Sequence, residues 1–389
     1  MSDSIVLRGI TWNHSRGYVP MVATAQRFSE LHPHVEIRWE KRSLQAFADF
    51  PIAQLTDTYD LLVIDHPWAG FAAASGVLLD LQAHLPADFM ADQAANSVGK
   101  SHASYHFDGY HCALAIDAAT PVASYRPDLL ARAGVDVPAT WDDLLALARR
   151  GLVAMPGIPL DTLMNFYMIC STAGKGPFVN DQWAVDDEMG VRALEMLREL
   201  AGYCTPEIFG WNPIAVYNAL SSRDDLAYCP FAYGYSNYAR RGYARHLLHF
   251  TDMVAIGAWG RCASTLGGTG LAIAAASPAR AATQAVALEY AQFVADPTIQ
   301  RTLYVESGGQ PGHRRAWLDP AVNQRTNDFF AATLPALDRA YLRPRYAGYL
   351  DFQDHAGAPV QEYVRHGGDA RAVLRRLEKL AHESAQNQQ

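Results

Sequence analysis

Hydrophobic and polar residues follow two different periods along the first part of the chain. Residues 4–11 form a short extended run, and the apolar residues of 20–31 recur at close to helical spacing, with Pro20 suited to the first turn. Residues 35–39 alternate as a half-buried strand, whereas 59–65 predicts a fully buried strand, as in a parallel sheet covered on both faces. Strands alternating with helices in this way predict a doubly wound α/β lobe.

The remainder of the chain predicts more helix than strand. Thr140, followed three residues later by Asp143, forms a capping-box pattern at the start of a helix. The other expected elements are strands at 111–116 and 271–277, and helices beginning near 125, over 191–200, over 281–295 and over 373–380. Pro297 is expected to end the helix before it.

Length and charge narrow the class of protein. A chain of 389 residues is long enough to predict two packed lobes, and its 50% hydrophobic and 19% charged residues indicate a globular protein. The formal net charge is -8, and no run of lysine or arginine is long enough to follow a phosphate backbone, which argues against nucleic acid. No apolar stretch approaches the length of a membrane span.

Two features bear on the cellular compartment without deciding it. The first eight residues have neither the basic region nor the apolar region of a secretory signal, so either a signal was removed or the protein stays in the cytoplasm. The cysteines include no C-x-x-C pair and are expected to be small buried hydrophobes, although one disulfide stays open. They are Cys112, Cys170, Cys204, Cys229 and Cys262.

Six blocks of sequence, taken in order, resemble a known family. The blocks are 10–18, 28–37, 59–65, 108–114, 125–130 and 138–143. Together they resemble the family 1 extracellular solute-binding proteins, the group that includes the maltose-binding and other carbohydrate-binding components of ABC importers. The resemblance runs over nearly the whole chain and rests on the order of the blocks rather than on any one of them.

The resemblance implies a two-lobed α/β periplasmic-binding-protein fold with a ligand cleft between the lobes and closure about a hinge. It places lobe 1 at residues 1–117 plus 262–309, and a helix-rich lobe 2 at residues 118–261 plus 310–389. It implies non-catalytic capture of a small polar solute, a sugar or a sugar-derived acid, for a membrane ABC permease. It also implies a periplasmic or extracytoplasmic location, a monomer and no cofactor.

The first group of candidate ligand contacts lies in loops expected to follow strands. A polar solute needs flat aromatic surfaces and rigid polar groups, and both occur where the first and third strands are expected to end. The first loop offers Trp12, Asn13, His14, Arg16 and Tyr18, and we favour a site there because a plain surface turn would expose two aromatic rings. The second loop offers Asp65, His66 and Trp68, of which Trp68 could equally pack under the next helix.

The segment 228–238 is the most unusual in the chain. Its aromatic residues form no helical stripe, and strand alternation does not continue through Pro230. We therefore expect a contact loop that presents Tyr233, Tyr235, Asn237 and Tyr238, with core packing as the alternative for at least half of the tyrosines.

Weaker candidates come from glycine-rich and arginine-rich segments. Trp259 precedes Gly267 and Gly268, which are expected just before a strand, where backbone amides approach a ligand closely or the chain crosses between lobes. Gln310 is expected to reach ligand or to lie in a hinge, and Arg345 suits a carboxylate. The His and Arg residues of these loops favour a mildly anionic solute.

Other chemistry finds less support. His102 and His106 have the spacing of a helical zinc pair, with His111 close by, but residues 107–109 are expected to form a turn, so we expect no metal site. No G-x-S-x-G elbow is present. A Cys–His pair stays open, which leaves a cytoplasmic enzyme or ligand sensor with this fold as the alternative function.

Overall fold

The structure is a computed structural model that describes residues 4–43, 52–174, 176–275 and 281–386. The chain forms two compact units, each discontinuous in sequence. Unit 1 comprises Met1–Ala119 and Gly267–Gln324, and unit 2 comprises Thr120–Leu266 and Arg325–Gln389. Each unit is described below by itself.

Unit 1 extends further than the lobe predicted from the sequence, chiefly because of residues 310–324. The Gly312 N–H donates to Ile116 O at 3.1 Å, and Gly312 O accepts from Val98 N at 3.3 Å. His313 Nε2 lies 3.2 Å from Asp92 Oδ2. Backbone and side-chain bonds therefore tie this segment to unit 1, whereas the predicted boundary had assigned it to the second lobe.

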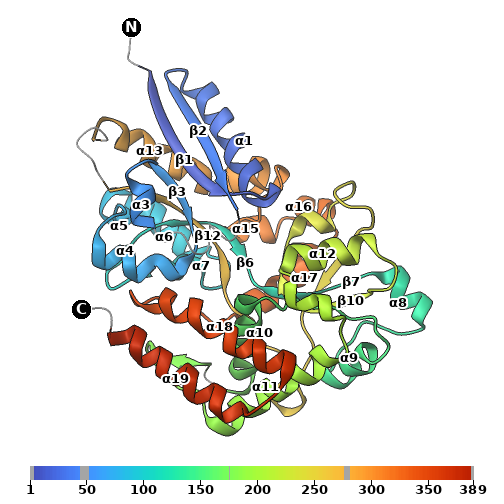
Figure 1. Cartoon of the computed structure of the whole chain (residues 1–389). Helices are drawn as coiled ribbons and strands as arrows, with labels where there is room; N and C mark the ends of the chain where they lie inside the picture. Colours follow the sequence, from blue (N-terminus) through green and yellow to red (C-terminus); the bar gives the residue numbers. More distant parts are fainter. Residues whose placement is uncertain (1–3, 44–51, 175, 276–280, 387–389) are drawn as a thin grey trace. The chain divides into compact units, whose positions relative to one another are not determined.

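Unit 1 is a five-stranded sheet with helices packed against it, in the strand order β2-β1-β3-β12-β6 (Figure 1). Its strands are β1 (Ile5–Trp12), β2 (Val35–Arg42), β3 (Leu61–Ile64), β6 (Leu114–Ala119) and β12 (Gly267–Ile273), with a hairpin of β4 (His106–Phe107) and β5 (Tyr110–His111). Strand β1 is parallel to β2 and β3, whereas β12 is antiparallel to β3 and β6. The sheet is thus mixed, a common variant of doubly wound folds.

The helices of unit 1 lie in the first and last parts of its sequence. They are α1 (Ser15–Leu31), α3 (Ile52–Thr56), α4 (Ala69–Ser75), α5 (Leu81–His84), α6 (Ala87–Ala95), α7 (Ser101–Ser104), α13 (Ala281–Ala295), α14 (Pro297–Ile299), α15 (Arg314–Trp317) and α16 (Pro320–Arg325), with the short turns η1 (His66–Trp68) and η6 (Gln300–Tyr304). The predicted helix over 281–295 is confirmed, and Pro297 starts the next helix.

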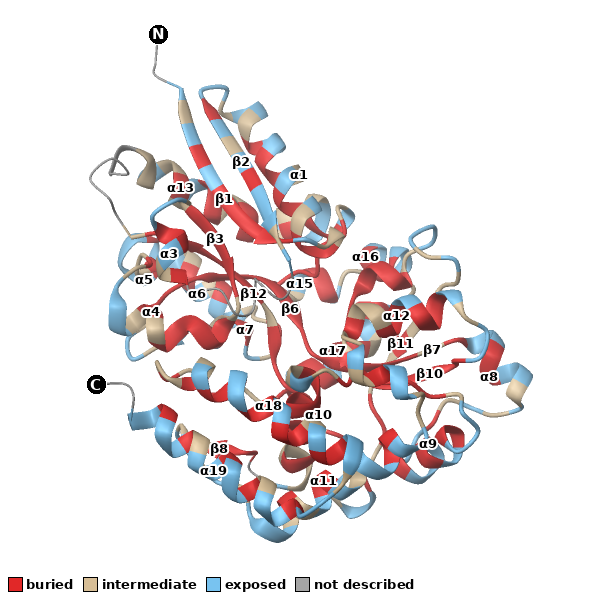
Figure 2. Cartoon of the chain, in the orientation of Figure 1, coloured by how far each residue is buried: buried red, intermediate tan, exposed pale blue. Residues whose placement is uncertain are grey.

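The core of unit 1 joins α1, β2 and α13. Strands β3 and β6 are buried along their whole length, as Figure 2 shows, which explains the continuous apolar sequence of β3. Tyr290 of α13 is fully buried; its hydroxyl accepts from Trp39 Nε1 at 3.2 Å and lies 3.0 Å from Thr24 Oγ1. The edge-to-face contact of Phe28 with the Tyr290 ring completes this junction.

Four expectations for unit 1 are wrong in detail. Helix α1 begins at Ser15, so Pro20 lies inside the helix rather than in its first turn. The expected strand at 111–116 is divided between the end of β5 and the start of β6. Strand β12 begins at Gly267, earlier than expected, so the glycines lie within the strand and not in a loop before it. The strand expected at 271–277 ends at Ile273, and its last residues, 276 and 277, lie outside the described residues.

Unit 2 is mostly helical. Its helices are α8 (Pro127–Ala133), α9 (Trp141–Ala148), α10 (Pro159–Ala173), α11 (Asp187–Gly202), α12 (Pro213–Ser222), α17 (Phe329–Asp338), α18 (Tyr349–His366) and α19 (Ala370–Gln386), with the short turns η2 (Pro206–Gly210), η3 (Ser236–Ala239) and η4 (Gly257–Trp259). Helix α18 packs against α10, α11 and α19. The capping box at Thr140 is confirmed, because its hydroxyl and the Asp143 carboxylate bond each other's backbone N–H.

The main sheet of unit 2 has the order β10-β7-β11 and is antiparallel throughout. Its strands are β7 (Pro121–Tyr125), β10 (Tyr228–Tyr233) and β11 (His249–Thr251), and a separate hairpin pairs β8 (Phe178–Val179) with β9 (Gln182–Trp183). The expectation that Pro230 prevents a strand is wrong, because β10 passes through it with a register shift between Cys229 and Ala232. A proline is accommodated at such an irregularity.

All five cysteines are free, so the disulfide left open by the sequence is not formed. Four are buried, and burial raises the pKa of the Cys170, Cys229 and Cys262 thiols. No helix in the described ranges is long and apolar enough to cross a membrane.

Candidate ligand-binding site

The junction of β1 and α1 is a tight turn rather than a long loop. Trp12 is the last residue of β1 and is 3% exposed, and a Cβ on Gly17 would collide with its indole ring. Asn13 is exposed, and its N–H donates to Arg42 O at 2.7 Å. His14 caps α1 by accepting the Arg16 N–H on Nδ1 at 3.0 Å. Burial, with the Arg16 charge, lowers the pKa of His14 to about 4, so this imidazole is neutral at pH 7.

Arg16 faces inward and forms a buried ion pair. Its Nε donates to Asp117 Oδ2 at 2.9 Å and its Nη2 pairs with Oδ1 of the same carboxylate. Both side chains are almost fully buried, and desolvation raises the pKa of Asp117 although Arg16 opposes the rise. The Arg16 guanidinium is thus committed to a residue 101 positions away, a pairing invisible in the sequence.

The other predicted contacts near this junction differ in exposure. Tyr18 is half-buried, with the Lys41 ammonium 4.9 Å from its ring centroid. Gln310 is buried and bonds β6 twice: its Nε2 donates to Ala118 O at 3.1 Å, and its own carbonyl accepts from Ala118 N at 2.9 Å. Gln310 therefore holds the segment after α13 and η6 against the sheet.

Asp65, His66 and Trp68 follow β3 in the turn η1. Asp65 caps this turn by accepting the His66 N–H at 2.8 Å, and its Oδ1 is 3.1 Å from His66 Nδ1. The two side chains thus lie on the same side of the turn. His66 is fully buried, and Trp68 is 7% exposed with its ring edge-on to Phe71 at 5.6 Å. This geometry shows that the Trp68 indole packs in the core.

The tyrosines predicted for a contact loop lie at the end of β10 and in η3. Tyr233 is half-buried, and its hydroxyl is 3.0 Å from Thr265 Oγ1. Tyr235 and Tyr238 are buried beside Tyr217, and the Tyr238 hydroxyl donates to Asn218 Oδ1 at 2.7 Å. Asn237 is 2% exposed, and within the described part of the chain its Oδ1 accepts no hydrogen bond. Tyr235 and Tyr238 therefore pack in the core, which is the alternative to a contact loop that the sequence left open.

Each of the weaker candidates makes contacts with neighbouring residues of the protein. Trp259 is half-buried beneath the Arg192 guanidinium, 4.4 Å from its ring. Gly268 has a φ of 103°, and a Cβ there would collide with Asp117 O, so β12 requires a glycine to approach β6. Gly267, its buried neighbour, pairs with Ala119 of β6. Arg345 lies near Asp181, whose carboxyl accepts a backbone hydrogen bond from it and feels its charge.

One candidate was missed in the sequence, Asp161. It lies in the first turn of α10 and is 5% exposed. Within the described residues no hydrogen bond or ion pair reaches its carboxyl group. Burial raises its pKa to about 8, so the group is largely protonated at neutral pH and offers both a donor and an acceptor. Perturbed and unpaired buried carboxyls mark functional sites more often than other acids do.

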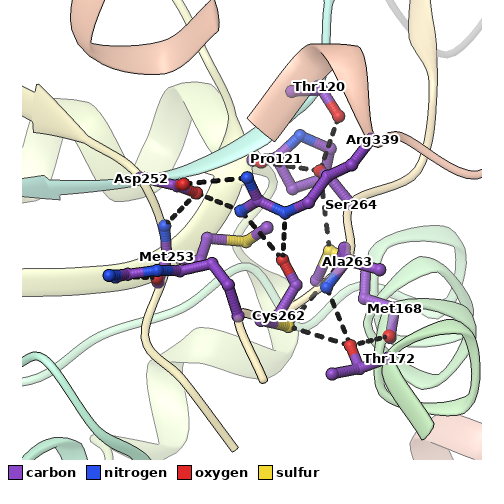
Figure 3. A network of polar contacts seen from close by, with 11 residues as sticks. Thr120, Pro121, Met168, Thr172, Asp252, Met253, Cys262, Ala263, Ser264 and Arg339 are labelled. Atoms are coloured by element: carbon purple, nitrogen blue, oxygen red, sulfur yellow. Dashed lines mark hydrogen bonds and ion pairs between the residues drawn. The ribbon is translucent and has the colours of Figure 1, made fainter. Parts of the chain in front are cut away.

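A polar network holds the segment 252–264 of unit 2 in place (Figure 3). The Arg339 guanidinium pairs with the Asp252 carboxylate and donates twice to Cys262 O, at 3.1 and 3.0 Å. Ala263 N–H donates to Thr172 Oγ1 at 2.8 Å, and Ser264 Oγ donates to Pro121 O at 2.7 Å. The chain that leaves unit 2 after Leu266 is therefore anchored to α10, β7 and α17.

The model of the bacterial extracellular solute-binding protein family matches residues 11–301. The chain belongs to this family, and binding of a solute is its role. The comparison with curated proteins found no match.

Solved structures share the fold over almost their entire length. The maltose-bound MalE3 of T. maritima has a TM-score of 0.84 and 17% identity, covering 98% of this chain and 100% of its own. A solute-binding protein of Agrobacterium radiobacter K84 in complex with ribitol has a TM-score of 0.82 and 19% identity, covering 99% of each chain. UgpB of Mycobacterium tuberculosis, in complex with glycerophosphocholine, has a TM-score of 0.79 and 18% identity, covering 98% of each chain. The predicted two-lobed α/β fold is confirmed.

Proposed function

We propose that this protein captures a neutral polyhydroxylated solute, a sugar or a polyol, and delivers it to a membrane ABC permease without changing it. The family assignment carries the solute-binding part of this proposal. The ligand class is supported by the solutes named for similar structures, maltose and ribitol, and by the charges of the candidate residues.

The candidate cations are neutralised or neutral, which argues against a sugar acid. Asp117 occupies Arg16, and Asp181 lies beside Arg345. His14 is uncharged at pH 7, because its pKa is lowered to about 4. An anionic solute gains little from such groups, whereas solute hydroxyl groups match the polar side chains of Asn13, which is exposed, and of Asp161, whose carboxyl is largely protonated.

Asp161 is proposed as the main polar contact of unit 2. Its protonated carboxyl can donate one hydrogen bond to a solute hydroxyl and accept another, and a buried site with such a group rejects ligands that leave it unpaired. Tyr18 and Trp259, which are half-buried, are proposed as the stacking surfaces. Hinge closure around the solute stays a prediction.

The experiment is a thermal-shift screen with matched pairs of solutes. Each sugar or polyol is tested beside its acid: glucose with gluconate, ribitol with ribonate, maltose with maltobionate. Because a ligand that binds the folded state raises the melting temperature, we expect shifts from neutral members and smaller or no shifts from the acids. If only the acids raised the melting temperature, the proposal of a neutral ligand would be wrong, but the proposal that the protein binds a solute would stand.

The same screen separates a binding protein from the enzyme alternative. After incubation with the best solute, NMR of the filtrate is expected to show the solute unchanged. Consumption of a compound that causes no melting shift would contradict the transport role. We also propose an extracytoplasmic location and a monomer, the latter checked by size-exclusion chromatography with light scattering.

A further inference from the structure

Unit 1 contains a pocket that the proposed solute site does not use. It has a volume of about 460 Å³ and is formed by α5, α6, α7 and the β4–β5 hairpin. Its lining residues are Gln82, Ala87, Met90, His102, Ala103, His106 and His111. Three imidazoles around one pocket call for an explanation, since histidine is otherwise spread thinly along the chain, with 14 residues in 389.

The hairpin, rather than a helix, brings these histidines together. Helix α7 ends at Ser104, so His102 and His106 do not share a helical face. His106 pairs with His111 across the hairpin, whose turn residues Asp108 and Gly109 have φ values of 49° and 78°. Two consecutive positive φ values are typical of a two-residue hairpin turn. The His111 ring is then 4.4 Å from the His102 ring and 6.0 Å from the His106 ring, between centroids.

Two ring nitrogens in this group are buried without a hydrogen-bond partner among the described residues. They are His102 Nδ1 and His111 Nε2. His111 is 1% exposed, and His102 is half-buried. The lone pair of an imidazole nitrogen that no protein group occupies is the group that binds a metal ion.

The lining of the pocket includes no carboxylate that would hold an imidazole in its protonated form. Neutral imidazole is the form of histidine that binds metal ions.

We propose that this pocket binds one divalent transition-metal ion through His102 Nδ1 and His111 Nε2, with copper(II) preferred and water completing the coordination. Within the part of the chain described, no three His, Cys, Asp or Glu side chains are grouped as ligands. A structural zinc ion therefore fits this site poorly, because it needs four protein ligands. Calcium and magnesium also fit poorly, because they prefer oxygen ligands. Two imidazoles with water match a tetragonal copper site, and copper(II) binds nitrogen ligands most tightly among these ions.

The test is calorimetric titration of the full chain with copper(II) in the presence of glycine, which competes for adventitious sites. We expect one equivalent of copper to bind, and binding at least tenfold weaker in His102→Gln and in His111→Gln. The matched control is His355→Gln, an exposed histidine of α18 whose replacement is expected to leave binding unchanged. Zinc is expected to bind more weakly than copper.

Electron paramagnetic resonance provides the second readout. Copper bound at this site is expected to show coupling to two imidazole nitrogens in the wild-type chain and to one in His102→Gln. If the melting curve shows that His111→Gln is unfolded, the test rests on His102→Gln, since His102 is only half-buried, and on the spectrum of that variant. Absence of stoichiometric copper, or equal binding by His102→Gln and His355→Gln, shows adventitious copper only and overturns the proposal.

Discussion

Asp161 shows how much of the candidate site depends on the surroundings of single residues. In the sequence it resembles Asp142, since each is an acid in the first turn of a helix. In the structure Asp142 is exposed, whereas Asp161 is 5% exposed and has a pKa raised to about 8. Sequence alone cannot make this distinction, because burial is set by distant parts of the chain.

The Asp161 carboxyl makes stability depend on pH in a defined direction. Its folded pKa is above its unfolded value, so it favours the folded state at low pH, and this contribution is lost between about pH 4 and pH 8. We expect Asp161→Asn to gain about 2 kcal/mol or more relative to wild type on going from pH 5 to pH 8. Urea unfolding at a series of pH values measures this difference. Asp142→Asn is the control, and the same trend in both variants would argue against the burial of Asp161.

The buried pair of Arg16 and Asp117 makes a second residue-level prediction. Arg16→Met leaves a buried carboxylate unpaired, which we expect to lower the free energy of unfolding by about 3–5 kcal/mol. Arg8→Met breaks the exposed pair with Glu40 and is expected to cost at most about 1 kcal/mol. Equal losses in chemical denaturation would mean that Arg16 is not buried with Asp117.

At the scale of elements, the sequence predicted regular strands and helices well and their junctions poorly. Strands β1 and β2 and helices α13 and α19 followed from apolar periodicity, because each buries one face or both. The start of α1 was missed because its cap is the imidazole of His14, an unusual capping group. Strand β10 was missed because a bulge accommodates Pro230. The start of β12 was missed because its first residues are glycines, which the strand requires where Gly268 approaches Asp117 O.

The capping box of α9 gives a prediction at this scale. Thr140→Ala removes the hydroxyl that accepts the Asp143 N–H at 3.2 Å, and we expect a loss of about 1 kcal/mol in the free energy of unfolding. Thr205, which precedes η2, makes no such capping bond, so Thr205→Ala is the matched control and is expected to have little effect. Comparable losses in thermal or urea unfolding would indicate that the cap contributes nothing.

At the scale of the whole molecule, the order of sequence blocks predicted the fold and the family, whereas the ligand contacts needed the structure. Three similar structures share the fold although their sequence identity to this chain is only 17% to 19%. Side-chain partners could not be predicted in this way, because they join distant positions of the chain. Arg16 pairs with Asp117, and the β4–β5 hairpin brings the His111 ring close to the His102 ring. For this reason the expected charge of the ligand differs: the sequence favoured a mildly anionic solute, whereas the structure favours a neutral one.

The most direct test of solute capture is calorimetric titration of the full chain with the neutral sugar or polyol that gives the largest melting shift. We expect one molecule to bind per chain, at least tenfold more weakly in Asp161→Ala, a loss of about 1.4 kcal/mol or more, and with unchanged affinity in Asp142→Ala. NMR of the recovered solute is expected to show no chemical change. Failure of every neutral solute to bind, or turnover of the bound one, would contradict the account.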